Sequence, residues 1–144
     1  MPTYELKEEA DKVILDEGTI VNAEVVSIKL KDKVSQAGKP YQQLLWTFAI
    51  QEPGQPYDSQ YIYGDTFPDF NTRSDCELRA WAQEIMATEF PPGFNLDTDV
   101  LVGMQCCVEV GFRIYEKNGD TKSTNFVRDI MRSRSSLSHA EEPF

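Results

Sequence analysis

The chain has 144 residues, the length of one domain, and 40% of them are hydrophobic, as is normal for a folded globular protein. Its apolar runs fall short of the roughly 18 residues that a transmembrane helix needs, and its start lacks the pattern of a secretion signal, so we expect a cytoplasmic protein without membrane contact. The net charge of −10 excludes long-range attraction of the whole molecule to a polyanion.

The charge is unevenly distributed along the sequence. Acidic residues gather in residues 1–18 and 74–103, whereas residues 29–41 contain a single acid, Asp32. The same basic segment contains four lysines: Lys29, Lys31, Lys33 and Lys39. The total charge is therefore a poor guide to the local surface.

The first part of the chain predicts an arm followed by strands. In residues 1–17 apolar positions are too sparse for a helix face, so we expect a mobile or loosely docked acidic N-terminal arm. Residues 19–30 are rich in β-branched side chains, and their alternation changes phase near Val25–Val26, which is typical of a bulged strand. Strands are also predicted over 43–50 and 58–63.

The period then becomes helical. Ser74 followed by Glu77 fits a capping box for a helix over about 75–88. Its expected apolar stripe is Leu78, Trp81, Ala82, Ile85 and Met86. Alternation resumes over 102–115, Asn118–Gly119 predicts a hairpin turn, and a last strand is expected over about 122–131.

The order of three strands, one helix and two strands predicts an all-β domain over residues 18–131. It is typical of the oligonucleotide/oligosaccharide-binding (OB) fold, a five-stranded β-barrel with one capping helix. Residues 132–144 are expected to form a flexible C-terminal tail. Oligomeric state stays open.

Proteins that bind single strands need cations to contact the phosphates and flat side chains to stack on the bases. In this sequence, side chains of these two kinds occur near the two predicted hairpins and on the middle strands. Trp46 stands in register with Leu44 and Ile50, a pattern that is also typical of a core face. The candidate nucleic-acid-binding residues are Lys29, Lys31, Lys33, Lys39, Tyr41, Trp46, Tyr61, Tyr63, Arg113, Tyr115, Lys117 and Lys122.

The C-terminal residues Glu141, Glu142, Pro143 and Phe144 resemble the acidic tail ending in Pro-Phe of bacterial single-stranded DNA-binding proteins. The resemblance implies that Phe144 and its carboxylate enter a basic, apolar-floored pocket on a replication or repair protein. The body, through 18–23, 97–103 and 125–127, is similar to small OB-type proteins of bacteriophage replication or recombination clusters. A phage origin would place the protein in the cytoplasm of a bacterial host.

Catalysis has little support in the sequence. His139 lies in the expected tail, and Cys76, Cys106 and Cys107 suit neither a disulfide framework nor a zinc site, so we expect no cofactor, no metal and no enzyme activity. The main hypothesis is single-stranded DNA binding with little sequence preference. Two alternatives remain: an acidic OB-type protein-interaction module, and a metal-dependent nuclease using Asp65, Asp97 and Asp99.

Overall fold

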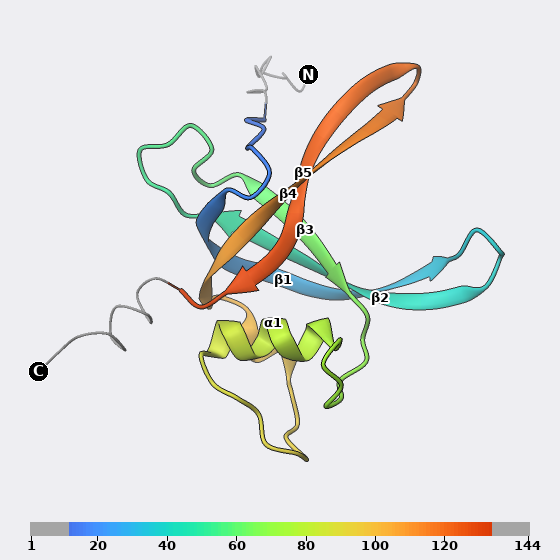
Figure 1. The fold of residues 1–144 in the computed structure, drawn as a ribbon, viewed down its shortest axis with the longest axis vertical. Helices are drawn as coiled ribbons and strands as arrows, with labels where there is room; N and C mark the ends of the chain where they lie inside the picture. The colour runs from blue at the N-terminus through green and yellow to red at the C-terminus, as the bar shows by residue number, and fades with distance from the viewer. Residues whose placement is uncertain (1–11, 134–144) are drawn as a thin grey trace, which may run out of the picture.

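The computed structural model describes residues 12–133, which form a mostly antiparallel β-sheet with one α-helix (Figure 1). Between the third and fourth strands lie the helix α1 (Glu77–Met86) and the short 3-10 helix η1 (Thr98–Leu101). The five strands are β1 (Ile20–Val34), β2 (Pro40–Ile50), β3 (Tyr61–Thr66), β4 (Gln105–Lys117) and β5 (Asp120–Met131). The predicted order of elements is confirmed. No helix in this part of the chain is long and apolar enough to cross a membrane.

All five strands belong to one sheet, in the order β3-β2-β1-β4-β5. The central strand β1 pairs with β4 over Ile20–Glu24 and with β2 from Ala23 onward. Its register with β2 shifts between Val25 and Ser27, which confirms the predicted bulge. A bulge bends a strand, so one long β1 can serve both neighbours.

The two edge strands, β3 and β5, also lie in contact with each other. Gly64 of β3 makes this approach possible, because a Cβ atom there would stand 2.9 Å from Val127 Cβ of β5 and 2.9 Å from the Trp81 ring of α1. Real Cβ atoms do not come so close, so a larger residue would push β3, β5 and α1 apart.

The core lies between the inner face of the sheet and α1. Trp46 and Phe48 of β2 stack with ring centroids 6.0 Å apart, and Trp81 of α1 meets Trp46 edge-on at 5.3 Å. All three rings are buried. Leu78, Ala82 and Ile85 complete the apolar stripe of α1, as predicted, and Met86 is partly buried.

The helix begins differently from the prediction. Its N-cap is Cys76, without a side-chain capping hydrogen bond, so the expected capping box of Ser74 and Glu77 is wrong. Ser74 lies two residues before the cap, in a turn that Cys76 N closes by donating to Arg73 O. The helix ends at Ala87, whose left-handed backbone (φ 54°) is typical of a helix C-terminus.

Two long hairpins extend beyond the core, one formed by β1 and β2 and the other by β4 and β5 (Figure 1). The second turns at Asn118 and Gly119, both with positive φ, which confirms the predicted turn. Toward this tip, Phe112 and Ile114 continue the alternation of the buried Val108 and Val110, but they are 38% and 63% exposed. The alternation of apolar and polar residues predicts which side of a strand a side chain takes, but it does not predict where along the strand the core ends.

Candidate nucleic-acid interface

The pairing register brings the candidate lysines of β1 and the candidate tyrosines of β2 and β3 onto the outer face of the sheet. Residues directly opposite each other in antiparallel strands point to the same side. Lys33 is opposite Tyr41 and Lys31 is opposite Gln43. Thr47 of β2 is opposite Tyr63, and Ala49 is opposite Tyr61. We call this surface, from the β1–β2 hairpin to β3, the outer face.

Lys29 takes part in the same surface beside an acidic residue. Leu45 of β2 is opposite Lys29 on one side and Asp65 of β3 on the other. The outer face is therefore positive toward the β1–β2 tip, where Lys31 and Lys33 stand, and mixed in charge where Asp65 approaches. Lys39 is exposed in the turn, where its backbone N donates to Ser35 Oγ.

Three of the predicted tyrosines meet in one hollow between β3 and the β4–β5 hairpin. Tyr61 and Tyr63 of β3 and Tyr115 of β4 line a pocket of about 150 Å³. These side chains are 49%, 42% and 40% exposed. Because Tyr buries its ring while offering a polar hydroxyl, three such rings around one hollow suit a flat ligand. We call this hollow the tyrosine pocket.

The remaining predicted cations lie on the β4–β5 hairpin, on the side that carries Tyr115. Tyr115 is opposite Lys122, and Lys117 is opposite Asp120. Arg113 lies over the ring of Phe126, with its guanidinium 5.2 Å from the ring centroid. Phe126 in turn covers Gly111, where a Cβ would run into its ring. The hairpin thus presents a cation–aromatic pair next to the tyrosine pocket.

Trp46 does not belong to this surface. Its side chain has 0% exposure, and its indole N–H donates to Thr66 Oγ1 at 3.0 Å. This corrects the expectation that Trp46 stacks on a ligand, because a base could reach it only after the core opens. The apolar register with Leu44 and Ile50 was the correct signal for a core position.

Phe67 is an aromatic residue that sequence reasoning missed. It follows β3 directly, is 60% exposed, and its ring centroid lies 6.5 Å from that of Tyr41. It therefore adds a ring to the outer face next to Tyr41. The only sequence signal was a large apolar residue before a proline, at the end of a strand.

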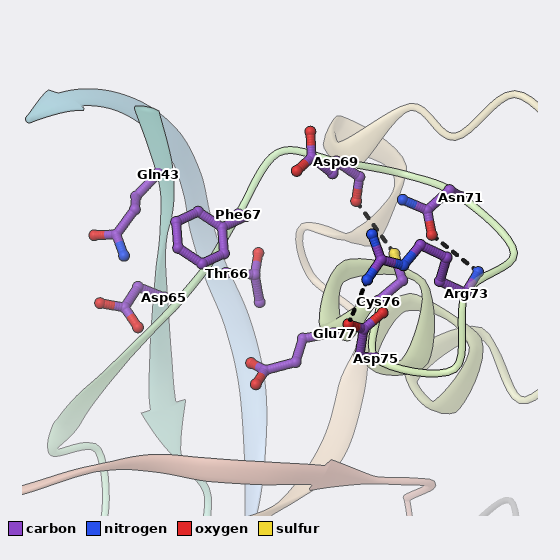
Figure 2. A pocket seen from close by; sticks show the side chains of 10 residues that line it. All are labelled: Gln43, Asp65, Thr66, Phe67, Asp69, Asn71, Arg73, Asp75, Cys76 and Glu77. Carbon is purple, nitrogen blue, oxygen red and sulfur yellow. Dashed lines mark hydrogen bonds and ion pairs between the residues drawn. The ribbon is translucent and has the colours of Figure 1, made fainter. Parts of the chain in front are cut away.

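A second hollow, of about 360 Å³, is lined by ten residues, of which four are acidic and one, Arg73, is basic and pairs with Asp75 at 3.1 Å (Figure 2). Its carboxylates are Asp65, Asp69, Asp75 and Glu77. Burial, and then the charges of Asp65 and Asp129, raise the pKa of Glu77 above its ordinary value. The four carboxylates outnumber the one cation of this hollow, Arg73, so it would repel phosphates. We call this hollow the acidic hollow.

The aspartates considered for metal-dependent hydrolysis are Asp65, Asp97 and Asp99, and the structure does not gather them into a metal-binding group. Asp97 is the N-cap of η1, and its carboxylate accepts from Asp99 N at 3.0 Å. Within residues 12–133 no three His, Cys, Asp or Glu side chains form a group that could hold a metal ion. The three cysteines are buried, and burial followed by Cys107 raises the pKa of Cys106 to about 12.

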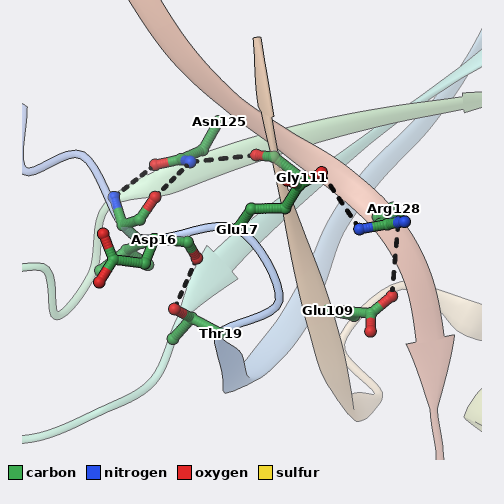
Figure 3. A network of polar contacts seen from close by, with 8 residues as sticks. Asp16, Glu17, Thr19, Glu109, Gly111, Asn125 and Arg128 are labelled. Carbon is green, nitrogen blue, oxygen red and sulfur yellow. Dashed lines mark hydrogen bonds and ion pairs between the residues drawn. The ribbon is translucent and has the colours of Figure 1, made fainter.

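Residues 12–17, which belong to the expected arm, dock between β3 and β5. Leu15 is buried, and its backbone N and O are bound by the side-chain amide of Asn125, which also donates to Gly111 O (Figure 3). Lys12 Nζ lies 5.7 Å from the ring centroid of Tyr63. Sequence reasoning missed Lys12 because its partners, which stand far along the chain, leave no local signal.

The remaining sequence-based sites lie outside the described residues. These are the arm residues 1–11 and the tail residues Glu141, Glu142, Pro143 and Phe144. No protein-family model matches the chain, and no curated protein matches it at a significant level.

Proposed function

We propose that this chain is an OB-type protein that binds single-stranded DNA with little sequence preference. Such a fold is a five-stranded, partly open barrel with its ligand on the second and third strands and between two hairpin loops. Three features support it: β1 is shared by β2 and β4, the edges β3 and β5 are in contact, and α1 lies between β3 and β4. In this proposal the contact of β3 with β5 closes the barrel.

The observation that carries the proposal is the register of the outer face. It aligns Lys31 and Lys33 beside Tyr41, on the side of the sheet where Tyr61 and Tyr63 stand exposed. A single strand needs this combination, because its phosphates require cations and its unpaired bases require rings. Each stacked base contributes about 1–3 kcal/mol and any base can stack, so we expect little sequence preference.

The net charge of −10 works against the long-range attraction of DNA to this protein. The acidic hollow and the acidic chain segments oppose the approach of a polyanion from a distance. Binding must therefore come from short-range contacts at the lysines and rings. We expect moderate affinity that falls as salt rises, because counterions are released when lysines neutralise phosphates.

Fluorescence-anisotropy titration with a labelled oligothymidylate at low and moderate salt tests the proposal. Tyr115→Ala should weaken binding by about 1–3 kcal/mol if one base stacks in the tyrosine pocket. Ile114→Ala is the matched control, because Ile114 directly precedes Tyr115 in β4 and points to the opposite side of the strand. Absent binding, or equal loss in both variants, would count against the proposal, and a matched duplex should bind more weakly.

An acidic OB-type protein-interaction module is the alternative function, and the acidic hollow is the observation that favours it. Asp75 already pairs with Arg73 at 3.1 Å, and the other three carboxylates, Asp65, Asp69 and Glu77, can offer a basic protein segment several ion pairs at once. In a pull-down, a protein partner recovered equally with and without nuclease treatment would support this alternative. Loss of the partner on Asp69→Asn/Asp75→Asn would then locate the contact.

The biological setting is a proposal that rests on sequence resemblance alone. A place in phage replication or recombination follows from the likeness of the body of the chain to small phage OB-type proteins. Recruitment of a replication or repair protein follows from the ending Pro143–Phe144. Truncation before Pro143 should leave oligothymidylate binding unchanged while abolishing partner recruitment.

A further inference from the structure

The ring of Phe126 in β5 lies against the backbone of β4. Phe126 is opposite Gly111 in the pairing register. A Cβ atom on Gly111 would stand 2.4 Å from Cζ and 2.7 and 2.8 Å from the two Cε atoms of the ring. Because these three distances are nearly equal, the Cβ position lies over the face of the ring and not beyond its edge. The missing side chain of Gly111 therefore lets the ring rest face-on against the backbone.

The backbone under this ring is fixed in place. Gly111 is buried, and its carbonyl oxygen accepts a hydrogen bond of 3.0 Å from the side-chain amide of Asn125 (Figure 3). The pairing of β4 with β5 continues past this point to the hairpin turn. The ring thus has a fixed support on its inward face and offers its outward face to other groups.

Arg113 takes that outward face. Its guanidinium lies over the ring, 5.2 Å from the ring centroid, and the residue is exposed. Within residues 12–133 this guanidinium forms no hydrogen bond or ion pair, unlike that of Arg128, which pairs with Glu17 at 3.1 Å. The ring therefore holds a planar cation whose N–H groups are free to bind a ligand.

A guanidinium in this position suits a nucleobase. Arginine stacks on aromatic rings, and its plane can in turn carry an unpaired base of a nucleic acid. The plane also lies close to the tyrosine pocket, because Thr124, which is opposite Arg113, lines that pocket. Tyr115 is two residues further along the same side of β4, about 7 Å away. One single strand can therefore reach both the tyrosine pocket and the Arg113 plane.

We propose that Gly111, Phe126 and Arg113 form a second nucleobase subsite, in which a base of the bound single strand stacks on the outward face of the guanidinium. The inference rests on the proposed function and adds a second base contact beside the tyrosine pocket. It gives Arg113 a stacking role, whereas its charge alone suggests a phosphate contact. Phe126 enters as a positioning residue, and Gly111 is needed because a side chain there would displace the ring.

Arg113→Lys separates the two roles of this residue, because it keeps the positive charge and removes the plane. The anisotropy titration uses two strands of equal length, an oligothymidylate and an abasic strand with the same phosphates. We expect Arg113→Lys to bind oligothymidylate at least about fivefold more weakly than wild type, and to bind the abasic strand as wild type does. Arg128→Lys is the matched control and should bind both strands as wild type does.

Phe126→Leu tests whether the ring positions the guanidinium. It should weaken oligothymidylate binding by about the same factor as Arg113→Lys and leave abasic binding unchanged. The double variant should lose little more than either single variant, because both changes remove one stack. Losses that add would show two independent contacts and would overturn the inference. If melting curves show that Phe126→Leu is unfolded, Arg113→Lys alone decides, since it leaves the ring over Gly111.

The outcomes separate the inference from the proposed function. Wild-type affinity of Arg113→Lys for oligothymidylate would overturn the inference. An equal loss on both strands would also overturn it, because Arg113 would then contact a phosphate. Either result leaves the proposed function in place if Tyr115→Ala still weakens oligothymidylate binding. Absence of oligothymidylate binding by wild type would overturn the proposed function itself.

Discussion

The inner and outer faces of β2 and β3 both carry aromatic rings, but the two sets have opposite surroundings. On the inner face, Trp46 and Phe48 are fully buried against Trp81. On the outer face, Tyr61 and Tyr63 are nearly half exposed beside the tyrosine pocket. Two neighbouring strands thus place their rings on opposite faces of the sheet, one in the core and one at the surface, so stability and binding should be separable by mutation.

The largest effect expected from this comparison is at Trp46. Trp46→Ala should lower the free energy of unfolding by about 3–5 kcal/mol, because it leaves a cavity in the core. Tyr63→Ala should leave the midpoint of urea denaturation within experimental error of wild type and weaken oligothymidylate binding instead. If Tyr63→Ala destabilised the protein as much as Trp46→Ala, the two faces would not have separate roles.

A smaller loss of stability is expected at Gly64 of β3, where the inner face of the sheet has no room for a side chain. Gly64→Ala places a methyl group 2.9 Å from both Trp81 and Val127. Overpacking of this kind costs about 1–3 kcal/mol, so thermal unfolding should begin at a lower temperature. Ala49→Ser, a small change on the outer face of β2, is the control. An unchanged melting temperature for Gly64→Ala would contradict the close contact of β3, β5 and α1.

The smallest effect concerns Glu77 of the acidic hollow, whose pKa is raised first by burial and then by the charges of Asp65 and Asp129. The raised pKa of Glu77 means that folding favours its protonated form, so its contribution to stability is greatest below its ordinary pKa and is lost as pH rises through the raised value. Glu77→Gln should therefore gain stability relative to wild type as the pH rises above the ordinary pKa of a glutamate. A stability difference that is independent of pH would contradict the raised pKa of Glu77.

Much of the fold could be predicted because its signals are local. The alternation of β3 put Tyr61 and Tyr63 on one side and Ile62 on the other, and the structure confirms this division, with Ile62 buried and both tyrosines exposed. The phase change at Val25 marked the bulge, and Asn118–Gly119 marked a hairpin turn. In each case the residue types determine backbone geometry within a few positions.

The features that could not be predicted depend on contacts between distant parts of the chain. Residues 12–17 are held by Gln60 and Asn125, which lie 47 and 110 residues along the chain from their partners Val13 and Leu15. The exposure of Ile114 depends on where the β4–β5 hairpin leaves the core. No local sequence pattern predicts these long-range contacts or the point where the hairpin leaves the core.

The most direct test of the central claim is the salt dependence of oligothymidylate binding by Lys31→Gln/Lys33→Gln. Leu30→Glu/Val34→Glu is its matched control, because it makes the same change in net charge on the other side of β1, at positions that are 54% and 68% exposed. If Lys31 and Lys33 each contact one phosphate, the slope of log K against log salt should decrease in magnitude by about 1.4 in the first variant. The control should keep the wild-type slope. An unchanged slope in the lysine variant, or equal changes in both, would contradict binding on the outer face.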